Sequence, residues 1–144
     1  MNIEQLVPPL ELCKLIPKGE FADSALVWHD GYNPLTKHHY TGVSERPPMT
    51  PNYYAEYPAP TLEEILAELN RLPGVLTPTA FIQQDTWTVD CAVDASGNLV
   101  GMITEDFMHD EDIKNLDIKE AKDKNPATAA LKLWLKLKGI EYEN

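Results

Sequence analysis

The alternation of apolar and polar side chains in the segment 86–94 is the feature that most constrains the fold. Its apolar members are Trp87, Val89, Cys91 and Val93, separated by threonine, aspartate and alanine. Successive side chains of a β-strand point to opposite faces, so this strand has one apolar and one polar face. The turn-forming residues 94–98 and a second short run, Leu99–Thr104, follow. We therefore predict an antiparallel hairpin with one buried and one solvated face.

An earlier pair of strands is indicated on either side of a turn-rich stretch. Residues 24–29 form a short run with β-branched and aromatic members, which is typical of a strand. Asp30-Gly31 and Asn33-Pro34 indicate a turn, and we expect residues 37–43 to return as a second strand.

Three helices are expected from capping and periodicity. Thr61 with Glu64 forms a capping box at the start of a helix over 61–72. Asn125 and Pro126 begin a second helix over 126–138, which Gly139 ends. The apolar spacing within Pro9–Lys18 predicts a shorter helix near the N-terminus.

Two segments show neither the helical nor the strand periodicity of apolar residues. Residues 45–60 are rich in proline and tyrosine, so we expect a loop that is neither helix nor central strand. Residues 105–124 are acidic, and we expect a second loop with at most a turn of helix near Asp117–Lys122.

Together these elements predict a single α+β domain over 1–144. We expect a small, mostly antiparallel sheet with helices packed on one face. Its strands would be residues 24–29, about 37–43, 79–93 and 99–104.

Composition and net charge limit the classes of function and the cellular setting that we expect. The formal net charge is −11 and the pI is near 4.6, so we expect no direct nucleic-acid binding through a basic face. Two cysteines, Cys13 and Cys91, make neither a disulfide framework nor a zinc pattern, which favours a reducing, cytoplasmic setting. No apolar segment approaches about 20 residues and no signal peptide is apparent, so we expect no membrane association.

The strongest candidates for chemistry are four residues around the first turn: His29, Asp30, His38 and His39. Imidazole and carboxylate ligands suit zinc or another divalent metal if a hairpin brings them together. Adjacent histidines on a strand point to opposite faces, however, which favours ordinary surface or cross-strand positions. We therefore assign no metal, cofactor or catalytic residue. A second polar cluster over 106–112 lacks the spacing of a calcium loop, so we expect a solvated acidic loop there.

Three segments resemble small uncharacterised proteins of phages, prophages and other mobile elements of gut bacteria. They are Ala-Leu-Val-Trp-His-Asp-Gly-Tyr at 25–32, Tyr-Pro-Ala-Pro-Thr-Leu-Glu-Glu-Ile-Leu at 57–66, and the Ala/Leu-rich helix ending in Gly at 125–139. The resemblance implies the same helices and a tryptophan-bearing hairpin, and it brings no catalytic residues. The acidic stretch 105–123 lies outside the shared pattern.

Three functional hypotheses follow. The first is a non-enzymatic accessory protein of a phage or mobile element, in the cytoplasm of a bacterial host, that binds a host or phage protein. The second is an acidic DNA mimic that occupies a nucleic-acid-binding protein, for which carboxylates must follow one face at roughly the phosphate spacing. The third is a metal-dependent hydrolase using His29, Asp30 and His38 or His39.

Overall fold

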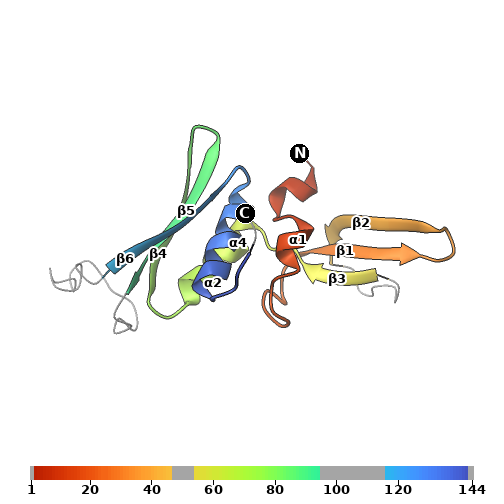
Figure 1. Ribbon diagram of the computed structural model, residues 1–144, viewed down its shortest axis with the longest axis horizontal. Helices are drawn as coiled ribbons and strands as arrows, with labels where there is room; N and C mark the ends of the chain where they lie inside the picture. The colour runs from red at the N-terminus through yellow and green to blue at the C-terminus, as the bar shows by residue number, and fades with distance from the viewer. Residues whose placement is uncertain (1, 47–53, 95–115, 143–144) are drawn as a thin grey trace.

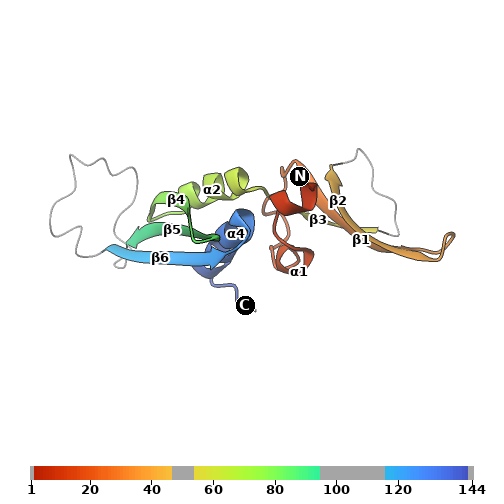
Figure 2. The same cartoon turned by 90° about the horizontal axis from the view of Figure 1, so that it is seen from above.

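The chain folds as an elongated α+β domain with a three-stranded antiparallel sheet toward each end (Figures 1 and 2). The structure is a computed structural model, and it describes residues 2–46, 54–94 and 116–142. The α+β class is confirmed, but the expected single sheet is two sheets. The early strands pair among themselves and with a third local strand, and the N-terminal helical segments lie between them and the second half of the chain.

The first sheet has β1 (Leu26–Asn33) at its centre, with β2 (His38–Glu45) and β3 (Tyr54–Pro58) at its edges. Both predicted early strands are therefore confirmed. The turn at Asn33-Pro34 is also confirmed, whereas Asp30-Gly31 lies inside β1. Strand pairing with both neighbours holds that dipeptide extended.

The strand β3 corrects part of the proline- and tyrosine-rich loop predicted over 45–60. Proline lacks a backbone donor, which confines it to the edge of a sheet, and β3 is an edge strand ending at Pro58. The described residues 54–60 therefore form neither a helix nor a central strand, as predicted. The prediction of a loop was wrong for Tyr54–Pro58.

The second sheet has β5 (Thr86–Asp94) between β4 (Val75–Gln83) and β6 (Leu116–Asp123). β4 and β5 are joined by Gln84 and Asp85, both at positive φ, as a tight two-residue hairpin requires. The predicted strand over 79–93 is thus two strands. The partner expected for β5 at Leu99–Thr104, and the acidic cluster at 106–112, lie outside the described residues.

An irregularity interrupts β4 between Leu76 and Thr79, where the register with β5 shifts. Thr77 has a φ of 48°, and Pro78 follows it without a backbone N–H to donate. This bulge bends an edge strand of the second sheet.

The strand β6 is a second correction, since residues 105–124 were expected to form a loop and Asp117–Lys122 a turn of helix. Ala121 is buried between β5 and α4, while Ile118 is 61% exposed on the other face. One small apolar residue on the inner face gives too weak an alternation to recognise.

The helices begin and end largely where capping predicted. α2 (Leu62–Arg71) carries the complete capping box of Thr61 and Glu64. α4 (Pro126–Leu137) begins after Asn125 and is followed by Gly139 at a φ of 76°. The predicted N-terminal helix is only α1 (Leu10–Cys13), and the short 3-10 helix η1 (Ile3–Leu6) precedes it.

The core is centred on α4, which packs on one face of the second sheet together with α2. The apolar face of β5 meets this helix, since Val89 and Cys91 are buried as the alternation predicted. On its other side α4 contacts the N-terminal half, where the rings of Phe21 and Trp134 meet edge to face at 5.0 Å. Both halves of the chain therefore share one hydrophobic core.

Asn125 links helix capping to the packing of the two halves. Its Oδ1 accepts a hydrogen bond from the Thr128 N–H at 3.1 Å, and its Nδ2 donates to the Gln5 carbonyl at 2.9 Å. We expect Asn125→Ala to lower the free energy of unfolding by about 1–2 kcal/mol, because the cap and a link to the N-terminal segment are both lost. Urea denaturation measures the difference.

Asn70 provides the matched control, because it is exposed near the end of α2. Asn70→Ala should leave stability unchanged or slightly raised, since alanine is the better helix former. Equal losses for the two variants would contradict the role assigned to Asn125.

Candidate functional site

The predicted metal-binding residues are divided between the two faces of the first sheet. Asp30 pairs with Thr41 and Tyr32 with His39 across β1 and β2, which places Asp30 and His39 on one face. His29 pairs with Gly42 and lies on the opposite face. The set His29, Asp30 and His38 is therefore not brought together. Among the described residues, no group of three or more His, Cys, Asp or Glu side chains is arranged to hold a metal ion.

Asp30 is the centre of a polar cluster on the face that α1 covers. Its carboxylate accepts a hydrogen bond from the Thr41 hydroxyl at 3.1 Å, and it lies 2.9 Å from His39 Nε2 and 3.5 Å from Lys14 Nζ. The hydrogen bond from Thr41, with the positive charges of Lys14 and His39, lowers the pKa of Asp30. Asp30 is therefore an ionised structural carboxylate rather than a proton donor at neutral pH.

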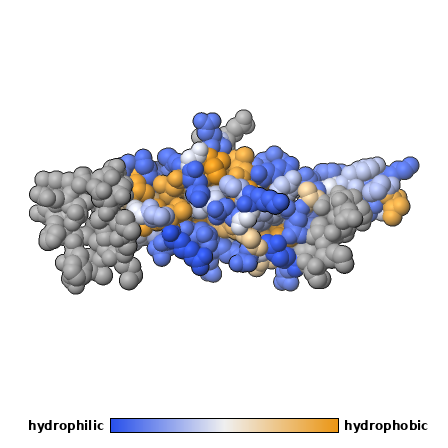
Figure 3. Space-filling model, turned by 90° about the horizontal axis from the view of Figure 1, so that it is seen from below, coloured by the Kyte–Doolittle hydropathy of each residue, from blue (hydrophilic) through white to orange (hydrophobic). Residues whose placement is uncertain are grey.

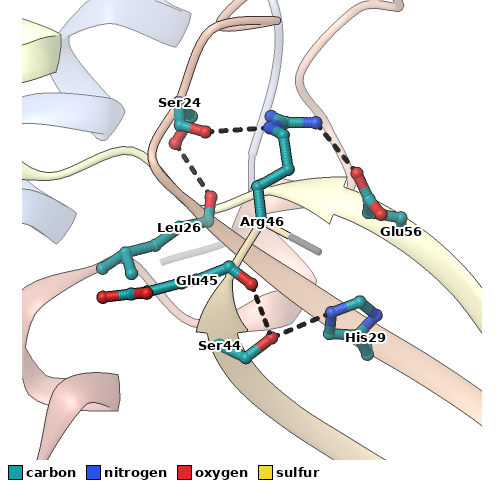
Figure 4. A network of polar contacts seen from close by, with 7 residues as sticks. All are labelled: Ser24, Leu26, His29, Ser44, Glu45, Arg46 and Glu56. Carbon is teal, nitrogen blue, oxygen red and sulfur yellow. Dashed lines mark hydrogen bonds and ion pairs between the residues drawn. The ribbon is translucent and has the colours of Figure 1, made fainter. Parts of the chain in front are cut away.

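On the opposite face, His29 and Ser44 form a pair that outwardly resembles a nucleophile and its base (Figure 4). His29 Nε2 lies 3.0 Å from Ser44 Oγ, and the Ser44 hydroxyl donates to the Glu45 carbonyl at 3.1 Å. The Ser44 hydroxyl is therefore shared between the His29 ring and a neighbouring backbone carbonyl. The pair joins β1 to β2.

A polar network that sequence analysis did not identify joins Arg46 to Ser24 and Glu56 (Figure 4), and Glu64 extends it to α2. Arg46 donates to the Ser24 carbonyl at 3.1 Å and to the Glu56 carboxylate at 2.9 Å. The Glu64 carboxylate, besides completing the capping box, accepts from the Ala25 N–H at 3.1 Å. Glu64 therefore holds the start of β1 against the first turn of α2. The capping motif was its only sequence signal.

Neither cysteine is placed to act as a nucleophile. Burial raises the pKa of the Cys13 thiol to about 12 and that of the Cys91 thiol to about 11. The thiolate is the reactive form, and it is scarcely populated near neutral pH in either residue. Both side chains act as small core residues.

The β1–β2 hairpin is the most prominent surface feature. Among the described residues, β3 pairs with β1 over Val27–Gly31, and the β1–β2 hairpin extends past this pairing to its turn at residues 34–37 (Figure 1). Its tip carries Leu35, which is 89% exposed, and Tyr32 and Tyr40 are about half exposed nearby. An apolar group is visible at that end of the molecule in Figure 3.

Hydrogen bonds to Asn33 close the turn at the tip of the ribbon. The Asn33 side chain accepts from the Leu35 N–H at 2.9 Å, and the Asn33 carbonyl accepts from the Lys37 N–H at 2.8 Å. The Tyr40 ring lies along its own strand over Gly42, where a Cβ would come within 2.5 Å of the Tyr40 hydroxyl. Local contacts therefore close the turn and cover part of the adjoining strand.

A pocket of about 650 Å³ lies at the junction of the two halves, between α1, the start of α4 and the C-terminal segment. Its size is within the usual range for ligand sites. The lining residues are Pro9, Glu11, Leu12, Leu15, Asp123, Thr128, Lys132, Glu141 and Tyr142. Lys132 and Asp123 form an ion pair of 3.1 Å on its wall.

No protein-family model, curated protein or solved structure matches this chain. Across the described ranges, every helix is too short or too polar to traverse a lipid bilayer. The candidate functional surfaces are therefore identified from geometry alone: the hairpin tip and the pocket beside α1.

The Asp30 cluster generates a pH-dependent prediction. A carboxyl group whose pKa falls on folding stabilises the native state above its unfolded pKa of about 3.9, and this contribution disappears as the pH falls through the lower folded value. We expect Asp30→Asn to lower the melting temperature at about pH 7 and the difference from wild type to shrink as the pH falls below about 3.9. Thermal melts followed by circular dichroism measure this.

The exposed Asp23 makes none of these contacts and gives a control. Asp23→Asn should run parallel to wild type over the whole pH range. An Asp30→Asn difference that did not shrink on acidification would show that the carboxylate is not the stabilising group.

Proposed function

We propose that this protein works by binding another protein, without catalysis, and that the β1–β2 hairpin tip is its binding element. The observation that carries this proposal is Leu35, which is 89% exposed in a hydrogen-bonded turn at the end of a projecting ribbon. An exposed leucine contributes nothing to the core, and turn positions are ordinarily polar.

The side chains around Leu35 are those that carry binding energy at interfaces. Tyrosine is enriched at hot spots because it offers a large, stiff and amphipathic surface. Tyr32 and Tyr40 come from the two strands behind the tip and lie on opposite faces of the ribbon, so each face carries one tyrosine. A ribbon already fixed by Asn33 loses little conformational entropy on binding.

The biological setting belongs to the same proposal. We place the protein in the cytoplasm of a bacterial host, encoded by a phage or mobile element, with a host or phage protein as the partner. Its support is the resemblance of the three segments at 25–32, 57–66 and 125–139.

Affinity capture with Leu35→Asp tests the proposal. Wild-type protein and the variant are immobilised, exposed to bacterial lysate, and the bound proteins are quantified by mass spectrometry. A charge at a hot spot should reduce recovery of the specific partner by about thirtyfold or more, because a buried contact worth about 2 kcal/mol is lost.

Ile118→Asp is the matched control, since Ile118 is also exposed and apolar but lies on β6 in the other sheet. It should leave recovery unchanged. The hairpin assignment fails if both variants lose the partner equally, and the binding function fails if wild type enriches nothing.

A further inference from the structure

We infer that a partner of the hairpin tip is a second copy of this chain, whose pocket beside α1 receives Leu35. The inference rests on the proposed function, because it takes the tip to be a binding element. It adds the identity of the partner and the surface that the tip contacts.

The pocket offers an apolar wall beneath an acidic rim. Leu12 of α1 and Leu15, which follows the helix, supply apolar surface, together with Pro9 and the Tyr142 ring. Three carboxylates line it against one lysine, and that lysine is already paired with Asp123. The excess negative charge therefore comes from Glu11 and Glu141.

Both of these carboxylates are available to a ligand. The Glu11 side chain is 86% exposed, and its contact with Lys14 is a loose 3.7 Å. Glu141 is exposed and forms no ion pair within the described part of the chain. A suitable ligand has an apolar group with a cation close beside it.

The hairpin tip has that composition. Lys37 follows Leu35 by two residues, and His38 and His39 come next. No carboxylate occurs between Asp30 and Glu45, although the whole chain carries a net charge of −11. With Lys37 close to Leu35, the tip is an apolar projection that carries a cation on an acidic molecule, and it complements the pocket in both charge and polarity.

The contact must be made between molecules. The tip points away from α1 at the far end of the first sheet, as both views of the ribbon show (Figures 1 and 2). A tip in one copy and a pocket in the next form a heterologous contact, which leaves one free tip and one free pocket. Association therefore continues into rings or chains rather than stopping at a symmetric dimer.

Salt should affect this association in two opposite ways. At about 10 mM salt the screening length is about 30 Å, so copies that each carry −11 repel as whole bodies. Near 0.15 M salt the screening length falls to about 8 Å. This removes the repulsion between whole molecules but leaves most of the attraction between the closely spaced charges of the tip and the pocket. We expect the strongest association at intermediate salt and a weaker one near 1 M.

Sedimentation velocity over about 1 µM to 1 mM protein at about 0.15 M salt tests the inference. The weight-average sedimentation coefficient of wild type should rise with concentration. Lys37→Glu alone, and Glu11→Lys with Glu141→Lys together, should each raise the dissociation constant at least about tenfold. Circular dichroism establishes that each variant is folded.

Mixing these two variants provides the decisive measurement. The reversed tip then faces a reversed pocket, and the wild-type tip of one variant faces the wild-type pocket of the other, so association should return. Lys18→Glu, an exposed residue away from both surfaces, changes net charge as Lys37→Glu does and should associate like wild type.

The inference is overturned if wild type sediments as a monomer throughout, if Lys18→Glu loses as much association as Lys37→Glu, or if the mixture does not recover. A monomeric wild type whose capture of another protein still depends on Leu35 would remove this inference and leave the proposed function standing. Self-association that is insensitive to Leu35→Asp would also remove this inference alone, because the capture experiment tests the proposed function separately.

Discussion

The burial of α4 is the interaction on which the rest of the structure depends. Eight of its twelve residues are buried, so the helix is covered on nearly all sides rather than along one stripe. One side rests on β5 and β6, and another meets the N-terminal half through Phe21 and Asn125. Neither small sheet has enough apolar surface to be stable alone, and α4 makes one core from both.

The parts of the fold that sequence predicted were those determined by local rules. Capping at Thr61 and Asn125 and the alternation along β5 depend on neighbours within a few residues, so their signals are complete in the sequence. The division into two sheets and the strand β6 depend on which distant strands pair. β6 carries charged side chains on both faces because only Ala121 reaches the core there, and such a strand reads as a loop.

The candidate site could be predicted only in part, because its geometry also depends on contacts between distant segments. His29 and Asp30 lie on opposite faces of the sheet because side chains alternate along a strand. The same alternation predicted from the sequence that His38 and His39 point to opposite faces. The exposure of Leu35 does not follow, since it depends on how far the hairpin projects beyond the elements that pack near its base. The pocket is assembled from α1, the start of α4 and the C-terminal segment, whose proximity no local pattern encodes.

The bulge in β4 has a consequence for how this molecule meets others. An unpaired edge strand is a template on which a foreign strand can add, and this is a common start of fibrous aggregation. The register of β4 shifts at Thr77, and Pro78 has no backbone N–H to donate. The outer side of β4 therefore cannot form a continuous ladder of hydrogen bonds with another strand. This protein exposes an apolar leucine on a projecting ribbon, but the irregular edge of β4 disfavours the addition of strands from other molecules to the second sheet.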